Sequence, residues 1–141
     1  MVTLGDDPLD ARPAGNCLVL IVEDNEKNLK LARDLLQVKG FRTLEAPDAS
    51  AGIAMAAARH PALVLMDIQL PDMDGWEALT RLRADPRTAD IPVVAVTAFA
   101  MEGDRERFLS AGFDGYITKP IDVRSFPGEI DGYCAKEVGG G

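Results

Sequence analysis

Short apolar runs alternate with longer segments of helical spacing along this chain. Residues 17–22, 62–66 and 91–96 are almost continuously apolar, a pattern typical of strands that are buried on both faces of a sheet. Residues 41–46 alternate more between apolar and polar side chains, which predicts a strand at an edge. Residues 114–118 form a shorter fifth run, which we place at the other edge.

Four segments between these runs are predicted to be helices. Leu29, Ala32, Leu35 and Leu36 recur at helical spacing, and Gly40 follows as a C-terminal cap. Residues 49–59 form an Ala-rich helix, and a third helix runs from residue 75 to the Asp-Pro pair at 85–86. Residues 99–111 form the fourth helix, with a glycine cap at position 112.

A fifth helical segment near the end of the chain is irregular. Asp122 is placed to cap it, but Pro127 and Gly128 follow within about one turn. An interior Pro costs about 3 kcal/mol and Gly about 1 kcal/mol relative to Ala. We therefore expect this helix to be kinked or to begin late, near Ser125.

The alternation of strands and helices predicts an α/β fold with a parallel sheet and helices on both faces. With the three apolar strands in the centre, the strand order is 2-1-3-4-5, a doubly wound, flavodoxin-like sheet. We expect one domain over residues 16–136, a flexible leader over residues 1–15 and a frayed tail over residues 137–141.

Composition and charge exclude several classes of protein. The 141 residues carry a formal net charge of -8, and the 15 Lys and Arg residues form no run, so a nucleic-acid surface is not expected. No apolar stretch approaches the roughly 20 residues of a membrane span. Residues 1–15 lack the hydrophobic stretch of a signal peptide. We expect a cytoplasmic protein whose Cys17 and Cys134 are reduced thiols, with Cys17 in the core.

Polar side chains of one chemical kind follow the predicted strands. The carboxyl ends of parallel strands share one edge of a sheet, so this edge should collect Glu23, Asp24, Asp67, Thr97 and Lys119. Clustered carboxylates repel one another unless a cation lies among them. Oxygen ligands of this kind suit Mg²⁺, and the site could then accept a phosphoryl group. Taken alone, Asp67 could equally be a turn residue.

Other ligands of this fold are less well supported. The chain contains neither GxGxxG nor GxxxxGK[ST], and its first strand leads into an acidic loop that would repel phosphate. The single histidine, His60, is interpreted as a helix-end residue, so catalysis by histidine is unsupported.

Four motifs resemble the receiver domain of bacterial two-component response regulators. They are LIVEDN at residues 20–25, LMDIQLP at 65–71, VAVTA at 94–98 and YITKP at 116–120. They occur in the order typical of the family and extend over most of the chain. Residues 91–101, IPVVAVTAFAM, are especially similar to stand-alone cell-cycle regulators within the family.

The resemblance implies a chemical role for each residue of the acidic set. Asp67 would accept a phosphoryl group from a histidine kinase or a histidine phosphotransfer protein as a mixed anhydride. Glu23, Asp24 and Asp67, with the backbone carbonyl of Gln69, would hold Mg²⁺. Thr97 would bond a phosphoryl oxygen.

The resemblance also assigns the segment around the fifth strand. Lys119 would neutralise a second phosphoryl oxygen, and the bond between Lys119 and Pro120 would be cis. Tyr116 would be an aromatic switch that moves inward as Thr97 is drawn to the phosphoryl group. The simpler interpretation of Tyr116 is a half-buried residue of an edge strand.

Two features depart from the common pattern of the family. Phe99 is bulky and, with Gln69, would line the entrance to the phosphoryl group and modulate dephosphorylation. The Pro127–Gly128 break falls in the last helix, which family members often use for output, so the partner cannot be inferred from the family.

Three functions follow from this sequence. The first is a single-domain, phosphorylation-dependent switch that signals to a downstream protein without binding DNA, and a homodimer is compatible with it. The second is a phosphorelay intermediate that passes the phosphoryl group to another histidine protein. The third is an adaptor that is never phosphorylated, which the complete acidic set argues against. A hydrolytic enzyme is least supported, because no second nucleophile is present.

Overall fold

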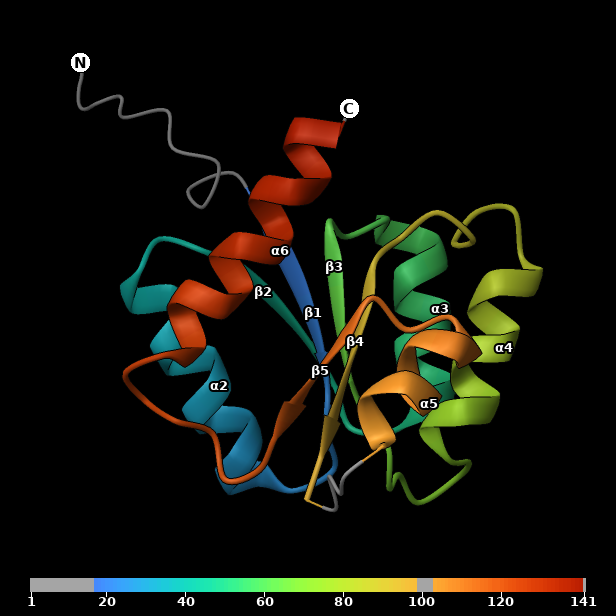
Figure 1. Cartoon of the computed structure of the whole chain (residues 1–141), viewed down its shortest axis with the longest axis horizontal. Helices are drawn as coiled ribbons and strands as arrows, with labels where there is room; N and C mark the ends of the chain where they lie inside the picture. The colour runs from blue at the N-terminus through green and yellow to red at the C-terminus, as the bar shows by residue number, and fades with distance from the viewer. Residues whose placement is uncertain (1–16, 99–102, 141) are drawn as a thin grey trace.

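A five-stranded parallel sheet forms the centre of the molecule, which we describe from a computed structural model covering residues 17–98 and 103–140 (Figure 1). From residue 135 onward the description is limited to the backbone. The strand order is β2-β1-β3-β4-β5, as predicted. The strands are β1 (Leu18–Val22), β2 (Arg42–Ala46), β3 (Leu63–Asp67), β4 (Val93–Thr97) and β5 (Gly115–Thr118).

Helices cover both faces of this sheet. In Figure 1, α2 and α6 lie on one face, and α3, α4 and α5 lie on the other. Two separate clusters of buried apolar side chains fill these two layers, so the predicted doubly wound α/β fold is confirmed. No helix in the described part of the chain is long and apolar enough to span a membrane. The helices are α2 (Glu26–Val38), α3 (Ala49–Arg59), α4 (Gly75–Ala84), α5 (Asp104–Ala111) and α6 (Phe126–Gly140).

The burial of each strand follows from its place in the sheet. Every residue of β3 and β4 is buried, because helices cover these strands on both faces and neighbouring strands flank them. In β2, by contrast, Arg42 is exposed and three further residues are only partly buried. Continuous apolar sequence therefore marks the central strands, and alternation marks the edge.

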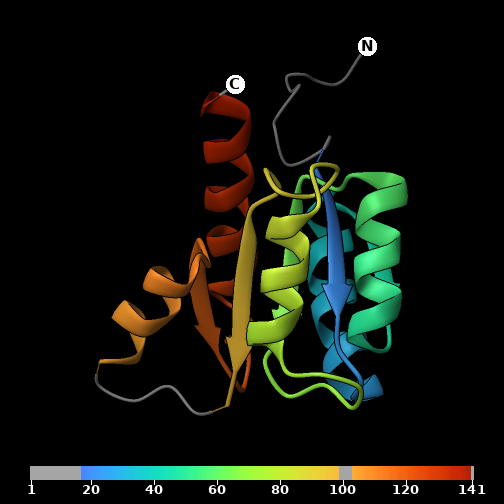
Figure 2. The same ribbon diagram turned by 90° about the vertical axis from the view of Figure 1, so that its right-hand side faces the viewer.

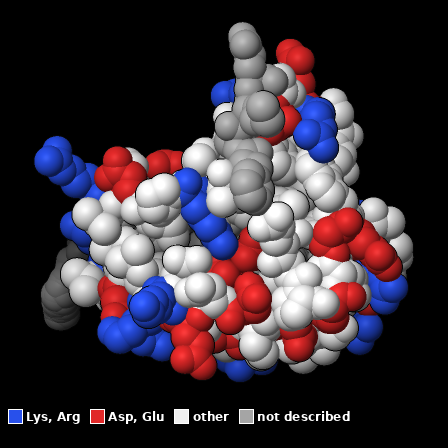
Figure 3. Space-filling model, turned by 90° about the horizontal axis from the view of Figure 1, so that it is seen from below, with Lys and Arg blue, Asp and Glu red and all other residues white. Residues whose placement is uncertain are grey.

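All five strands run in the same direction, so their carboxyl ends lie at one edge of the sheet (Figure 2). Figure 3 looks onto this edge, where acidic side chains gather near the middle of the face.

The helix ends include both predicted and unpredicted caps. The side chain of Asn25, which was not among the predicted caps, accepts hydrogen bonds from the N–H groups of Lys27 and Asn28 and so caps α2. Gly40 and Gly112 follow α2 and α5 with φ of 96° and 112°, a left-handed conformation that costs glycine little. The single histidine, His60, ends α3, as expected.

The fourth predicted helix begins later than expected. We predicted a start at residue 99, but α5 begins at Asp104, after Gly103 with φ of 92°. Gly103 is left-handed, so it cannot belong to a right-handed helix. Residues 99–102, and with them the predicted role of Phe99, lie outside the described part of the chain.

The last helix adopts the late start rather than the kink. The side chain of Asp122 accepts a hydrogen bond from the N–H of Arg124 at 2.9 Å, and α6 begins at Phe126. Pro127 is therefore in the first turn, where its missing N–H leaves no helical bond unmade. The helix runs to Gly140, so most of the predicted tail is helical here. Fraying of that end remains a prediction, as do the leader at residues 1–15 and the domain limits.

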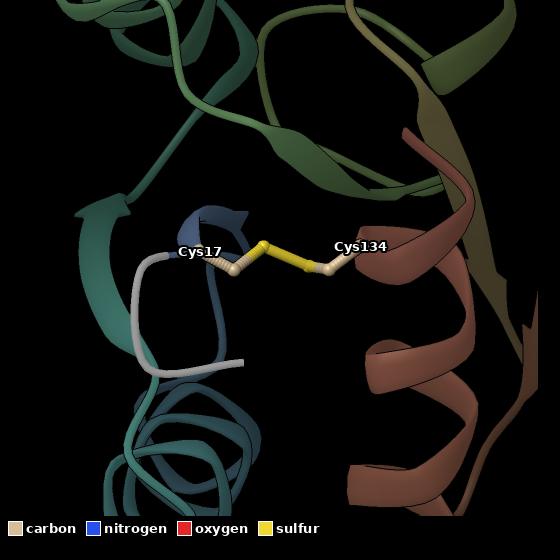
Figure 4. The surroundings of a disulfide bond; sticks show 2 residues. All are labelled: Cys17 and Cys134. Atoms are coloured by element: carbon tan, nitrogen blue, oxygen red, sulfur yellow. A yellow bond between two sulfur atoms is a disulfide. The ribbon is translucent and has the colours of Figure 1, made fainter. Parts of the chain in front are cut away.

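The two cysteines form a disulfide bond, so the prediction of reduced thiols was wrong (Figure 4). Cys17 lies at the start of β1 and Cys134 in α6, and their Cα atoms are 6.2 Å apart despite a sequence separation of 117. Both side chains are buried in the cluster that holds Phe126 and Ile130, so the core position expected for Cys17 is confirmed. Local sequence could not reveal the pair, because the path of the whole chain brings its ends together.

Reduction of the Cys17–Cys134 bond is expected to lower the free energy of unfolding by about 2–4 kcal/mol, because a cross-link that closes a long loop restricts the unfolded chain. Urea unfolding of the oxidised protein, with and without dithiothreitol, measures this difference. The Cys17→Ala/Cys134→Ala variant is the control, since reductant should not move its midpoint. Equal midpoints for oxidised and reduced wild type would contradict the expectation.

Candidate functional site

Strand register brings the five predicted site residues to one edge. β1 and β3 pair with Val22 opposite Met66, so Glu23 and Asp67 leave the sheet side by side. Asp67 and Thr97 are the last residues of β3 and β4. The structure thus places each predicted residue at a strand end, as expected.

Lys119 joins two buried carboxylates at the centre of this site. Its Nζ lies 2.9 Å from Oε1 of Glu23 and 3.0 Å from Oδ2 of Asp67. Glu23 is 5% exposed and Asp67 is 4% exposed, so water screens these charges poorly. The bond between Lys119 and Pro120 is cis, as the resemblance implied.

Burial and hydrogen bonding shift the pKa values of this pair. Burial raises the pKa of the Glu23 carboxyl, and the bond from Lys119 opposes this shift without cancelling it. For Lys119, burial alone would lower the pKa, but hydrogen bonds to Glu23 and Asp67 raise it above the usual value. Lys119 therefore stays protonated as an ammonium group. Its single positive charge does not neutralise the carboxylates around it.

A third carboxylate completes a set that could hold a cation. One ligand oxygen from each of Glu23, Asp24 and Asp67 can lie within 4.8 Å of the others. Asp24 is exposed, whereas the other two are buried, so a cation could enter the site from solvent. An all-oxygen donor set with several open positions fits Mg²⁺, which keeps part of its hydration shell.

The loop between β3 and α4 begins at the site, directly after Asp67. Oδ1 of Asp67 accepts a hydrogen bond from the N–H of Gln69 at 3.0 Å, so Asp67 caps the turn that follows β3, as one of its two interpretations expected. Gly75 closes the loop by donating to the carbonyl of Ile68 at 2.8 Å. A Cβ on Gly75 would meet Cα of Ile68 at 2.9 Å, so only glycine fits there without a shift of backbone.

Sequence reasoning overlooked two further carboxylates in this loop. Asp74 caps α4 by accepting from the N–H of Glu77 at 2.8 Å; an Asp directly before a helical segment is a signal that could have revealed it. Asp72 binds the first residues of α3, which are 22 and 23 positions away. No local pattern could have revealed that contact.

Tyr116 is half-buried on the edge strand β5 and takes part in an aromatic stack. Its ring centroid lies 5.3 Å from that of Phe108 in α5, and Phe108 lies 4.8 Å from Trp76 in α4. Both pairs are nearly parallel, with interplanar angles of 24° and 8°. The stack therefore connects the strand beside Thr97 to the two helices on that face, a link that the sequence analysis did not predict.

Comparisons with known proteins agree on the kind of domain. The chain is 47% identical over 115 residues to the polar-differentiation response regulator DivK of Brucella ovis, which covers 82% of this chain and 94% of that protein. The DivK of Brucella anthropi is 46% identical over the same length. The predicted likeness to this group of response regulators is confirmed.

Solved structures show the same fold. A CheY-like response regulator receiver domain protein from Methanospirillum hungatei matches with a TM-score of 0.79 and 29% identity, over 89% of this chain and 98% of that one. The receiver domain of a sensor histidine kinase from Pseudomonas aeruginosa, with a magnesium ion coordinated in its active-site cleft, matches with a TM-score of 0.76 and 30% identity, over 85% and 98%.

The profile of the response regulator receiver domain family matches residues 19–131. That stretch contains every strand residue from Val19 onward and the whole acidic site. The chain therefore belongs to the response regulator receiver family of two-component signalling.

Proposed function

We propose that this protein is a phosphorylation-dependent switch that accepts a phosphoryl group on Asp67 from a histidine kinase or a histidine phosphotransfer protein. The observation that carries the proposal is the contact of Lys119 with both Asp67 and Glu23. This contact leaves a nucleophilic carboxylate beside an ammonium group, at an edge where further negative charge needs a cation. A constitutive adaptor has no use for such an arrangement.

The chemistry assigned to Asp67 is a nucleophilic displacement at phosphorus. One carboxylate oxygen forms the new P–O bond while the P–N bond of a phosphohistidine breaks, and its electron pair returns to the imidazole. Lys119 holds Oδ2 of Asp67 and the N–H of Gln69 holds Oδ1, so the nucleophile is oriented before the donor arrives. Lys119 then neutralises charge on the transferred phosphoryl oxygens.

A divalent cation belongs to the same proposal. Glu23, Asp24, Asp67 and the backbone carbonyl of Gln69 would hold Mg²⁺, which supplies positive charge to the phosphoryl oxygens when bound. The donor set of this chain supports the assignment. So does the similar receiver domain from Pseudomonas aeruginosa, which holds magnesium in its active-site cleft.

The output of the switch is assigned to Thr97 and Tyr116. Thr97 is buried at the end of β4 and pairs with Thr118 of β5, so movement of Thr97 toward a phosphoryl group would disturb β5. Tyr116, two residues earlier on that strand, would change its present stacking on Phe108. The changed surface would bind a downstream protein in the cytoplasm, and a homodimer through that surface belongs to the same proposal.

Asp67→Asn is expected to abolish phosphorylation, because an amide lacks the nucleophilic carboxylate. Intact mass after incubation with acetyl phosphate, with and without Mg²⁺, measures the adduct. Wild type should gain one phosphoryl group in the presence of Mg²⁺ only. Asp90→Asn is the matched control, because Asp90 is an exposed carboxylate that contacts His60 instead of the site.

Failure of wild type to form any adduct, or an equal adduct on Asp67→Asn, would overturn the proposed function. If the adduct forms, the next measurement asks whether the phosphoryl group stays on Asp67 or is transferred. A change in affinity for a protein partner supports the switch, whereas rapid transfer back to a histidine protein supports a relay intermediate.

Lys119→Met is expected to lower the free energy of unfolding by about 1–3 kcal/mol, because it leaves two buried carboxylates without their charged partner. Added Mg²⁺ should recover part of this loss, since the cation replaces the missing positive charge. Urea unfolding at neutral pH with and without Mg²⁺ measures both effects. Lys30→Met is the control: it removes an exposed pair with Asp34 and should change little. Equal effects of the two substitutions would contradict the role of Lys119.

A further inference from the structure

Asp72 is an exposed residue in the loop between β3 and α4, yet its carboxylate makes three hydrogen bonds. It accepts from the N–H of Ala49 at 2.9 Å, from the N–H of Ser50 at 2.8 Å and from Oγ of Ser50 at 2.7 Å. Ala49 and Ser50 are the first two residues of α3. The carboxylate thus binds the amino end of a helix, where unpaired N–H groups and the helix dipole favour negative charge.

The α3 helix already has a local cap. Asp48 precedes the helix and accepts from the N–H of Ala51 at 2.8 Å. Two carboxylates therefore share one helix end, one from the chain directly before the helix and one from a loop 22 or 23 residues later. The second carboxylate connects two segments of the molecule that the first does not connect.

The loop that Asp72 anchors also contains Gln69, whose backbone carbonyl is assigned to the cation site under the proposed function. At its base the loop is closed by the bond from Gly75 to Ile68 and by an isolated bridge between Gln69 and Asp74. Its tip, at Asp72, is attached to α3. The backbone of Gln69 therefore lies between two fixed points, one at the end of β3 and one at the start of α3.

We propose that Asp72 is a positioning residue that anchors the β3–α4 loop to α3 and thereby holds the Gln69 carbonyl in place beside the carboxylates of Glu23, Asp24 and Asp67. The inference rests on the proposed function, because it assigns Asp72 to the same cation site without direct contact with the ion. Residues outside a metal's ligand set commonly set its affinity by orienting the ligands.

Hydrogen bonds favour the charged form of the Asp72 carboxylate. The hydrogen bond from the Ser50 hydroxyl, together with those from the backbone, lowers the pKa of Asp72 to about 2. The carboxylate is therefore ionised at neutral pH, the form that accepts these hydrogen bonds.

The test compares Asp72→Ala with Asp48→Ala in the full chain. Both remove a carboxylate from the amino end of α3, so both should lower the urea midpoint. We expect Asp72→Ala alone to weaken Mg²⁺ binding, measured by isothermal titration calorimetry, by about tenfold, the lower end of the effect of outer-shell substitutions. We also expect it alone to speed hydrogen exchange of the amides at residues 68–74, measured without Mg²⁺.

Asp72→Asn is a milder variant that should bind Mg²⁺ with intermediate affinity, because its amide oxygen can still accept one N–H. It keeps the test available if Asp72→Ala does not fold. The same Mg²⁺ affinity and the same loop exchange in the Asp72 and Asp48 variants would overturn the inference and leave Asp72 as a helix cap. Absence of Mg²⁺ binding in wild type would instead count against the proposed function, and exchange of the loop would still decide whether Asp72 orders it.

Discussion

The contact between Lys119 and the carboxylates of Glu23 and Asp67 is the interaction on which the site depends. Buried carboxylates on neighbouring strands repel each other, and an isolated pair in this position would favour protonation or unfolding. An ammonium group 2.9 and 3.0 Å away makes their burial tolerable. One ammonium group does not balance two carboxylates, and Asp24 adds a third. The excess of negative charge at this edge is a feature that could be offset by a cation.

The elements around this charge cluster are coupled to it by contacts between distant segments. On one side, the β3–α4 loop is anchored to α3 through Asp72. On the other side, β5 carries Tyr116, whose ring stacks on Phe108 and, through it, reaches Trp76. Aromatic stacks of this kind have defined geometry and are stabilising by roughly 0.5–1.5 kcal/mol per pair beyond burial. These contacts link β5 to α4 and α5 through side-chain packing.

The disulfide acts at the opposite end of the molecule. It joins the start of β1 to α6, a helix that contains Pro127 and several glycines and has low intrinsic stability. Packing of Phe126, Ile130 and Cys134 against the sheet stabilises this helix, and the covalent bond adds a restraint on the unfolded chain. The free thiols expected from the sequence are replaced by this bond, so we expect the oxidation state of Cys17 and Cys134 to influence stability.

The sequence by itself determined the fold class, the strand order and the five residues at the carboxyl edge. Each of these follows from local information. A continuous apolar run indicates a strand buried on both faces, and the residues that end the run are those at the carboxyl edge of the sheet. Helix caps such as Gly40 and Gly112 are local in the same way. Tertiary structure alone decided the pairing of Cys17 with Cys134, the attachment of Asp72 to α3 and the stacking of Tyr116 on Phe108. The cysteine pair and the Asp72 contact join residues far apart in the chain, and all three depend on side-chain packing between elements, which the periodicity of the sequence does not encode.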